Sequence, residues 1–561
     1  MVDYTREQPK ELTLPPRLPL VGLPNQRAGS TLQDSRLVNA YVELGQDDVI
    51  RVVKRPGLTV LHTMSGYGAG LFGEYSIFYQ AGEFPLVTSR LYQNGTQVST
   101  VDGYSSTDSP ERFFSFVQAP TGDETSVIFM HNGFVARTWE ESTSTLTAVP
   151  FADQAVGPLS CSIASGSTAV TTASTAALSA YSTVTGTGMP ASVYIESIDS
   201  ATAFTLSAPA TATNATASLS FNTAGIPFRD VVSLVDVRQL ADGAAVLNKA
   251  TYVFTLQSKL AGADPDEPLA WNPLNFLYAY VEQDTPTAIA RQLTHLIAFK
   301  STSTEFFRDA GVSPGSPLAR NDGLHLDVGC YSGRTVQSVD GNVFWVSSTE
   351  SGQRSVYVSE RLKAREIATP AIRRVLEDLS PAYSISFSVR GHTFYVVTDP
   401  TAGVSIVYDL ASSLWYYWSA LGVSYFPFVA ATYTQGQTRL QHATDGKIYV
   451  FDFDAVDDAG TPITMDIYPP QYDANSRVSK TLSRMHVVAD QERGSTLLVR
   501  CNDKDQASEE WTNWRTFDLG QPRPTLENFG SFTKRFFHFR HEARTPCRLT
   551  AVELEMQVGL L

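Results

Sequence analysis

Two histidines near the C-terminus have a spacing that suggests chemistry, because paired imidazoles are common zinc ligands. His538 and His541 stand three residues apart in the segment KRFFHFRHE. That segment has the composition of a strand, and strand side chains alternate between faces, so residues at i and i+3 point in opposite directions. We therefore expect two separate imidazoles and no shared metal ion.

An acidic run suggests calcium binding, because carboxylates at alternating positions of a loop hold Ca²⁺. It contains Asp452, Asp454, Asp457 and Asp458. The sixth position of such a loop requires glycine but is Asp457 here, and the twelfth position lacks glutamate. An acidic surface turn without a metal is the better interpretation.

The glycines of GYGAGLFG match a dinucleotide-binding fingerprint in form, with Gly68, Gly70 and Gly73 at the required spacing. That fingerprint needs a helix whose N-terminus faces the pyrophosphate. The following residues, EYSIFYQAG, predict a strand instead. We expect no cofactor.

Basic residues are densest in one short stretch, where they could touch phosphate. They are Arg361, Lys363, Arg365, Arg373 and Arg374. Acidic residues alternate with them, which is typical of a solvated, ion-paired face.

No nucleophile or proton-transfer group stands beside an orienting partner in the sequence. We therefore predict that the protein is not an enzyme.

The elements around this basic stretch are predicted most clearly. Asp340-Gly341 is a typical two-residue hairpin turn between a β-rich segment and the apolar run Val343–Val346. Farther on, Thr369 can cap a helix that begins at Pro370, and Pro381 stops it. The apolar residues of this helix follow at i, i+3, i+4 and i+7 and are Ile372, Val375, Leu376 and Leu379.

Similar groups of strands recur along the chain. Turn dipeptides at Asn94-Gly95 and Asn132-Gly133 separate β-branched and aromatic segments, and Pro56-Gly57 fits a type II turn in which glycine takes a positive φ. Strands come in threes and fours with a period of roughly 40 to 55 residues, which is the period of propeller blades. We predict an all-β fold containing a β-propeller of six or seven blades.

Composition changes mark the predicted domains. Between Leu159 and Phe228 there is no Lys or Arg, yet alternating segments predict a small inserted β domain rather than disorder. Beyond Pro469-Pro470 the strand pattern changes to that of a C-terminal β-sandwich-like domain. The predicted units are an extended N-terminal arm (1–35), the first part of the propeller (36–157), the inserted domain (158–225), the rest of the propeller (226–468) and the C-terminal domain (469–561).

Composition also excludes several classes of function. The formal net charge of −15 disfavours non-specific attraction to nucleic acid. The four cysteines are scattered without a CxxC pair, which fits a reducing cytoplasm rather than a disulfide framework. We recognise no secretory leader, and no apolar run is long enough for membrane insertion.

Several stretches in this order resemble the packaged-DNA stabilisation family of short-tailed bacteriophages. They are QDSRLVNAYVE with VVKRPGL, DGNVFWVS with SVYVSERLKAREIATPAIRRVL, VYDLASSLWYYWS, and WTNWRTFDLGQ with KRFFHFRHEARTPCRLTAVELEM. The resemblance covers most of the chain apart from the region near 158 to 225.

The resemblance implies a virion structural protein, the tail nozzle or hub. Six copies would form a ring below the portal and adaptor proteins, continue the DNA channel and help retain packaged DNA until ejection. Double-stranded DNA would pass without sequence-specific binding, a tail needle and fibre or spike proteins would lie below and around the ring, and assembly would take place in the cytoplasm of the bacterial host.

Seven residues are candidates for a structural or assembly role. They are Arg55, Pro56, Gly57, Thr369, Ile372, Leu376 and Leu379. The alternative function is a tail-associated propeller that binds or hydrolyses carbohydrate; hydrolysis would need two carboxylates about 5 to 9.5 Å apart in the propeller cleft. A third possibility is a soluble adhesion module that binds the host surface.

Overall fold

The computed structural model describes residues 16–22, 36–45, 49–64, 66–72, 77–81, 88–93, 96–102, 113–122, 125–149, 155–225, 238–312, 315–504 and 510–558. These residues are mostly strands, and their single α-helix is α1 (Pro370–Glu377). The prediction of an all-β fold is therefore confirmed. The predicted Asn94-Gly95 turn, Gly73 and most of the N-terminal arm lie outside the described residues.

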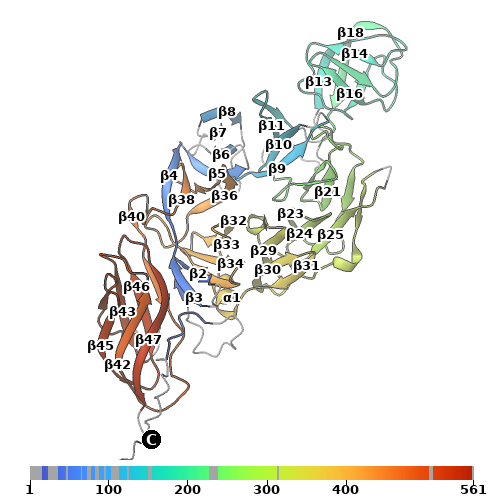
Figure 1. The fold of residues 1–561 in the computed structure, drawn as a ribbon. Helices are drawn as coiled ribbons and strands as arrows, with labels where there is room; N and C mark the ends of the chain where they lie inside the picture. Colours follow the sequence, from blue (N-terminus) through green and yellow to red (C-terminus); the bar gives the residue numbers. More distant parts are fainter. Residues whose placement is uncertain are drawn as a thin grey trace, which may run out of the picture.

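In the described chain, seven antiparallel groups of strands follow one another around a ring (Figure 1), five as separate sheets and two as parts of larger sheets; each group is called a sheet below. Their strands are β5 (Tyr67–Phe72), β6 (Ile77–Ala81), β7 (Thr88–Gln93) and β8 (Thr96–Asp102); β9 (Ser115–Pro120), β10 (Ser126–His131), β11 (Ala136–Glu140) and β12 (Thr145–Ala148); β19 (Ala245–Leu247), β20 (Ala250–Phe254), β21 (Lys259–Gly262) and β22 (Phe276–Tyr278); β23 (Pro286–Gln292), β24 (His295–Lys300), β25 (Thr304–Asp309) and β26 (Leu318–Arg320); β27 (Gly329–Cys330), β28 (Gln337–Val339), β29 (Asn342–Ser348), β30 (Arg354–Glu360) and β31 (Lys363–Glu366); β32 (Tyr383–Val389), β33 (His392–Asp399), β34 (Val404–Asp409) and β35 (Leu414–Tyr417); and β36 (Phe428–Thr434), β37 (Gln437–His442) and β38 (Lys447–Asp452) with β4 (Gly57–Thr63).

The ring is closed by a strand from the N-terminal part of the chain. Strand β4 pairs antiparallel with β38 and so completes the last sheet. Buried side chains join each sheet to the next, and the last sheet joins the first where Ile448 packs against Leu71 and Tyr92. Sheets packed face to face around a closed ring are the defining feature of a β-propeller.

Of two predicted hairpin turns, one has the expected two-residue loop and the other has a longer loop. Asp340 and Gly341 both have positive φ, 50° and 74°, and Val339 pairs with Asn342, as a two-residue hairpin requires. The hairpin at Asn132-Gly133 has four loop residues instead, because His131 pairs with Ala136. There the Asn132 Oδ1 atom accepts hydrogen bonds from the backbone N–H groups of Phe134 and Val135.

The low-charge region forms a six-stranded sheet that closes on itself. Its strands are β13 (Ala155–Ile163), β14 (Ala169–Thr172), β15 (Thr183–Gly186), β16 (Ile195–Ser200), β17 (Ala203–Leu206) and β18 (Asn214–Asn222). A bridge between Thr183 and Tyr194 connects the two end strands, which makes a small barrel around Phe204 and Phe221. The Tyr181 hydroxyl donates to the Asp264 carboxylate at 2.6 Å and so ties the barrel to the propeller.

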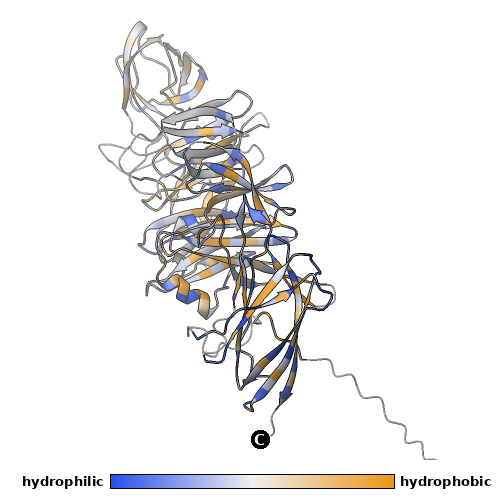
Figure 2. Cartoon of the chain, turned by 90° about the vertical axis from the view of Figure 1, so that its left-hand side faces the viewer, coloured by the Kyte–Doolittle hydropathy of each residue, from blue (hydrophilic) through white to orange (hydrophobic). Residues whose placement is uncertain are grey.

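Two packed sheets form the end of the molecule opposite the barrel (Figure 1). One contains β2 (Ala40–Leu44), β3 (Ile50–Lys54), β47 (Arg548–Val558), β42 (Lys480–Ala489) and β45 (Thr525–Phe532). The other contains β1 (Arg36–Val38), β41 (Met465–Tyr468), β46 (Phe536–His541), β43 (Thr496–Asn502) and β44 (Arg515–Asp518), and it is continuous with β32–β35 of the propeller because β1 pairs parallel with β35. Orange and blue residues alternate along these strands in Figure 2, as expected where one face is buried.

This end of the molecule includes strands β1 to β3, which were predicted to belong to the propeller. Strand β3 pairs with β47, and β1 pairs with β41. Residues 16–22 also lie here: the Leu18 N–H donates to the Val552 carbonyl at 2.8 Å, and Leu18 and Leu20 are buried. The short strands β39 (Asp457–Asp458) and β40 (Thr461–Pro462) lie beside β4 at the junction with the propeller.

Candidate functional site

A cavity of about 710 Å³ lies at the centre of the ring, within the size range of small-molecule binding sites. Its lining residues come from all seven sheets, on or beside strands β5, β9, β19, β23, β28, β32 and β36. Because no single sheet surrounds this space, the cavity exists only when the ring is closed.

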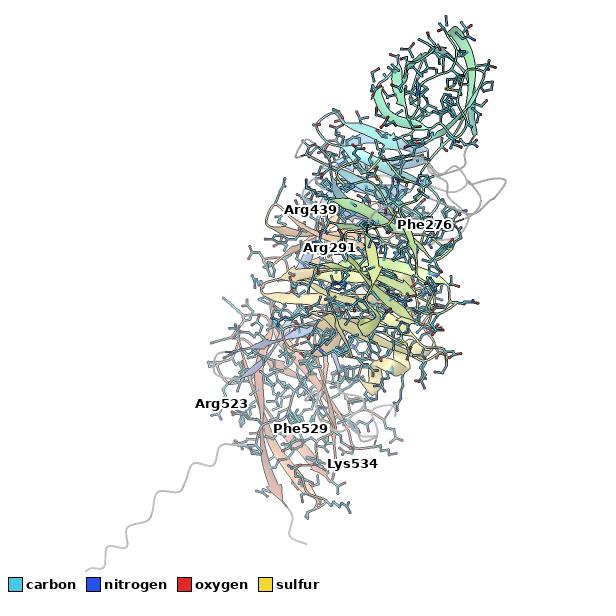
Figure 3. All side chains as sticks on the ribbon, turned by 90° about the vertical axis from the view of Figure 1, so that its right-hand side faces the viewer. Phe276, Arg291, Arg439, Arg523, Phe529 and Lys534 are labelled. Atoms are coloured by element: carbon cyan, nitrogen blue, oxygen red, sulfur yellow. The ribbon has the colours of Figure 1, made fainter. Side chains whose placement is uncertain are left out.

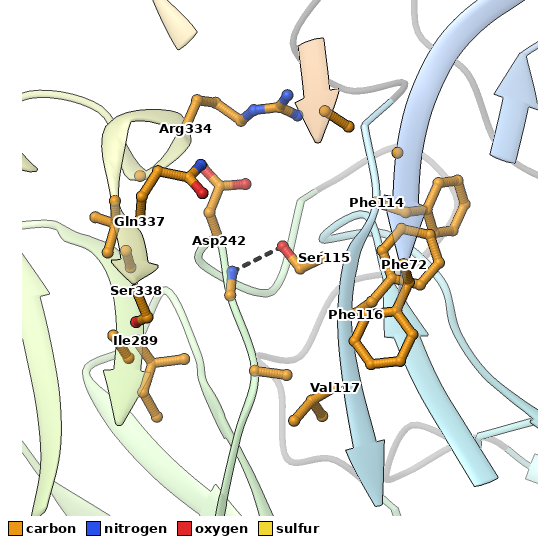
Figure 4. A pocket seen from close by; sticks show the side chains of 18 of the residues that line it. Phe72, Phe114, Ser115, Phe116, Val117, Asp242, Ile289, Arg334, Gln337 and Ser338 are labelled. Carbon is orange, nitrogen blue, oxygen red and sulfur yellow. Dashed lines mark hydrogen bonds between the residues drawn. The ribbon is translucent and has the colours of Figure 1, made fainter. Parts of the chain in front are cut away.

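One side of the cavity is aromatic (Figure 4). Phe72, Phe114 and Phe116 gather there, and the rings of Phe72 and Phe116 stack with centroids 5.8 Å apart. Gly70 makes this packing possible, because its φ is +151° and a Cβ there would lie 2.5 Å from the Phe116 ring. Only glycine therefore allows Phe116 to lie against β5.

The other side is polar and carries Asp242, Arg334, Gln337 and Ser338 (Figure 4). The Asp242 carboxylate accepts a hydrogen bond from Arg238 at 2.5 Å. The Gln337 side-chain amide donates to the Ser384 carbonyl at 2.9 Å.

Packing orients Arg334 on this polar side, and exposed residues show where the cavity opens to solvent. The Arg334 guanidinium lies 3.4 Å from the centroid of the Phe113 ring, which restricts its orientation. The exposed residues Gln118, Arg291 and Ser338 mark where the cavity reaches solvent (Figure 3 labels Arg291).

The carboxylates of the cavity do not match a glycoside hydrolase. Asp242 is the only carboxylate among the described residues that line it. Retaining and inverting hydrolases both need a second one at a defined distance. Within the described ranges, no group of three or more His, Cys, Asp or Glu residues is arranged to hold a metal ion, and no helix is long and apolar enough to cross a membrane.

Among the candidate assembly residues, Arg55 is buried at the junction between the propeller and the C-terminal sheets. Its guanidinium makes two parallel bonds to the Asp458 carboxylate, at 2.8 and 2.6 Å, and donates to the Ser419 carbonyl at 2.6 Å. Its Nε atom donates to the Asn39 side chain at 3.2 Å. One side chain thus connects four separate segments of the chain.

The prediction that Gly57 takes a positive φ in a type II turn is wrong. Gly57 is absent from the described glycines with positive φ. A Cβ atom there would instead lie 2.7 Å from the Ala455 carbonyl oxygen, and closer still to the Asp457 carbonyl. Glycine is needed because β4 begins against these carbonyls, directly after Pro56, and not because of a type II turn.

The predicted helix is present and lies between two neighbouring sheets. The Thr369 hydroxyl accepts a hydrogen bond from the Ile372 N–H at 3.4 Å, and α1 ends at Glu377, two residues before Leu379, the last apolar residue of the predicted helix. Ile372, Leu376 and Leu379 are buried among residues of β29, β30, β33 and β34. The apolar face of the helix is therefore buried within the chain itself.

The two C-terminal histidines lie on opposite faces of β46 and have different partners. His538 contacts Asp466 at 2.7 Å, and its ring stacks on Tyr468 with centroids 4.0 Å apart. His541 contacts the Lys54 ammonium at 3.3 Å and Ser495 at 2.9 Å. Burial, and then the charge of Lys54, lower the pKa of His541 to about 3; burial lowers the pKa of Lys54 to about 8.

The acidic run and the basic stretch each contain residues that form ion pairs. Asp458 is buried against Arg55, whereas Asp454 is exposed, so the run does not converge on one point. Arg365 pairs with Glu360 and Arg373 with Glu366, each at 2.6 Å, which confirms the predicted ion pairing for these two arginines. All four cysteines are buried free thiols.

Two buried charge clusters have no signal in the local sequence. Arg55 and Asp458 are separated by 403 positions, so no local pattern marks their pairing. Lys300 is fully buried and lies within 3.2 Å of both Asp284 and Glu305. A single lysine at the end of an apolar strand carries no signal that would predict these partners.

Comparison with known proteins gives one family. A family model described as "Bacteriophage P22 Gp10, beta-propeller" (Phage_stabilise) matches residues 171–456. No curated protein sequence matches the chain. The similar solved structures include a crystal structure of the computationally designed Ika8 protein, at 12% identity and a TM-score of 0.33, covering 70% of this chain and 99% of that one.

The matched residues include four of the seven sheets that surround the central cavity, three of the four strands of a fifth, and most of the barrel. They amount to just over half of the 561 residues. The chain therefore belongs to the phage stabilisation family of β-propeller proteins typified by P22 Gp10.

Proposed function

We propose that this protein forms the nozzle, or hub, of a short phage tail as a ring of six copies below the portal and adaptor proteins. The observation that carries the proposal is the family match over residues 171–456, which supports a structural role in the virion and in packaged-DNA stabilisation. The ring would continue the DNA channel and retain DNA until ejection, and a tail needle and fibre or spike proteins would contact it below and around.

The closed circuit of sheets supports a propeller of seven blades, with β4 completing the last. The barrel and the two C-terminal sheets lie at opposite ends of the molecule (Figure 1), so both remain accessible for contacts with other copies or other tail proteins. Six identical subunits that each bind the next through a heterologous contact close into a ring with C6 symmetry.

The charge of the chain fits passage of DNA. Acidic residues exceed basic ones by 57 to 42. A channel wall with excess negative charge repels the phosphate backbone and lets the duplex slide. Acidic residues would therefore line the lumen, and a net basic lumen in the assembled ring would contradict this part of the proposal.

Assembly tests the proposal directly. The purified chain, alone and with the portal–adaptor complex of its phage, is analysed by native mass spectrometry and electron microscopy. A six-fold ring below the adaptor is the expected result. A protein that stays monomeric with that complex, or that is absent from the tail of the purified virion, would refute it.

The second candidate, a glycan-hydrolysing propeller, is disfavoured by the single carboxylate in the described cavity lining. Release of reducing sugar from bacterial surface polysaccharide by the purified protein would favour that candidate over a structural role.

A further inference from the structure

We propose that the central cavity binds one or two neutral pyranose units of a saccharide without cleaving them. The site does not require the assembly of six copies, because every described lining residue belongs to a single chain. The chemical class is a neutral hexose or N-acetylhexosamine unit.

The aromatic side fits one feature of a pyranose. Each sugar ring has a face of C–H groups with a weak positive charge, and aromatic rings offer a negatively charged, apolar face. Phe72 and Phe116, which stack on each other and are only partly buried, supply such a surface beside the buried Phe114. This wall would bury the apolar face of the sugar and exclude water from it.

The polar side fits the other feature, the rim of hydroxyl groups. Arg334 carries a planar group with several donors, Gln337 keeps one N–H beside the one that it donates to Ser384, and the Asp242 carboxylate and the Ser338 hydroxyl provide acceptors. These residues lie across the cavity from the phenylalanines (Figure 4). A ligand between the two walls would therefore meet apolar contacts on one side and hydrogen-bonding groups on the other, which is the usual composition of a small-molecule site.

Charge favours a neutral ligand. Away from the exposed Arg291, the described lining carries one cation, Arg334, and one carboxylate, Asp242. Asp242 is already paired with Arg238, so no cluster of unopposed cations is present to hold a phosphate or sulfate group. The single carboxylate allows binding but does not supply the acid–base pair that hydrolysis requires.

Binding is tested with defined sugars as probes. Maltotriose, cellotriose and N,N′,N″-triacetylchitotriose are titrated into the full-length protein, with saturation-transfer NMR and calorimetry as readouts. Arg334→Gln removes the guanidinium, and Ser338→Trp places a bulky ring at the exposed edge of the cavity. Arg390→Gln is the matched control, because Arg390 also lies over an aromatic ring, that of Phe453 at 3.7 Å, but outside the cavity.

At least one of the three sugars is expected to bind the wild-type protein. Both cavity variants should weaken this binding tenfold or more while their thermal unfolding stays unchanged, and the control should bind within twofold of the wild type. Absence of binding to all three sugars, or equal binding by the cavity variants, would overturn the assignment. Release of reducing ends by the wild-type protein would overturn the claim that the site does not cleave.

Discussion

Replacing Arg55 by methionine should destabilise the junction between the propeller and the C-terminal sheets more than most single substitutions. The side chains of Arg55 and Asp458 are only 1% and 2% exposed, so the pair is removed from water. Without the guanidinium, Asp458 keeps a buried charge, and the Ser419 carbonyl loses its donor. Removing one partner of such a buried pair costs about 3–5 kcal/mol of unfolding free energy.

A double-mutant cycle separates the pair from its surroundings. Asp458→Asn is made alone and together with Arg55→Met, and unfolding in guanidinium chloride is followed by tryptophan fluorescence; Trp418, which is buried beside Ala40, lies close to the junction. Because the double variant contains neither buried charge, its loss should be smaller than the sum of the single losses by about 2 kcal/mol or more. Additive losses, or a loss below about 1 kcal/mol in Arg55→Met, would refute the reasoning.

Three further predictions concern the helix, pH and the barrel. Leu376→Ala should lower the free energy of unfolding by about 2–5 kcal/mol because Leu376 is fully buried between two sheets. Arg374→Ala on the same helix is the control and should change the melting temperature little. Equal melting temperatures of the two variants would contradict this packing. The folded-state pKa of His541 is about 3 against an ordinary 6.5, so the unfolded chain binds a proton first as the pH drops. The free energy of unfolding should therefore fall by roughly 3–5 kcal/mol between pH 6.5 and 3. In His541→Gln this free energy should depend less steeply on pH, and an unchanged dependence would exclude this origin. Ala155 pairs directly with Asn222, so the two ends of the barrel segment lie side by side. Replacing residues 156–221 by a short Gly-Ser linker should therefore leave the propeller folded, as measured by circular dichroism and limited proteolysis. Aggregation of the shortened chain would mean that the barrel is needed for folding.

Local sequence determined the parts of the fold that depend on a few neighbouring residues. The Asp340-Gly341 turn formed as predicted because both residues tolerate positive φ, and the cap at Thr369 formed because a hydroxyl there can accept from the first helical turn. Alternation and turn spacing were enough to predict an all-β propeller. These features are encoded within about ten residues, so they can be predicted without knowing the partner strands.

The sequence also determined how neighbouring side chains of one strand are directed. The two histidines on β46 were expected to face apart, and the structure gives each its own partners. This follows from the two-residue period of a strand, which places i and i+3 on opposite faces whatever lies beside them.

Tertiary structure alone decided how distant segments combine. Strand β4 closes the ring, β1 to β3 join the C-terminal sheets, and Arg55 finds Asp458 across 403 positions. Many strands of similar composition compete for each free sheet edge, so only the packing of the whole chain selects the pairs. The central cavity has the same origin: its aromatic and polar walls come from strands far apart in the sequence, and they face one another because the seventh sheet packs against the first.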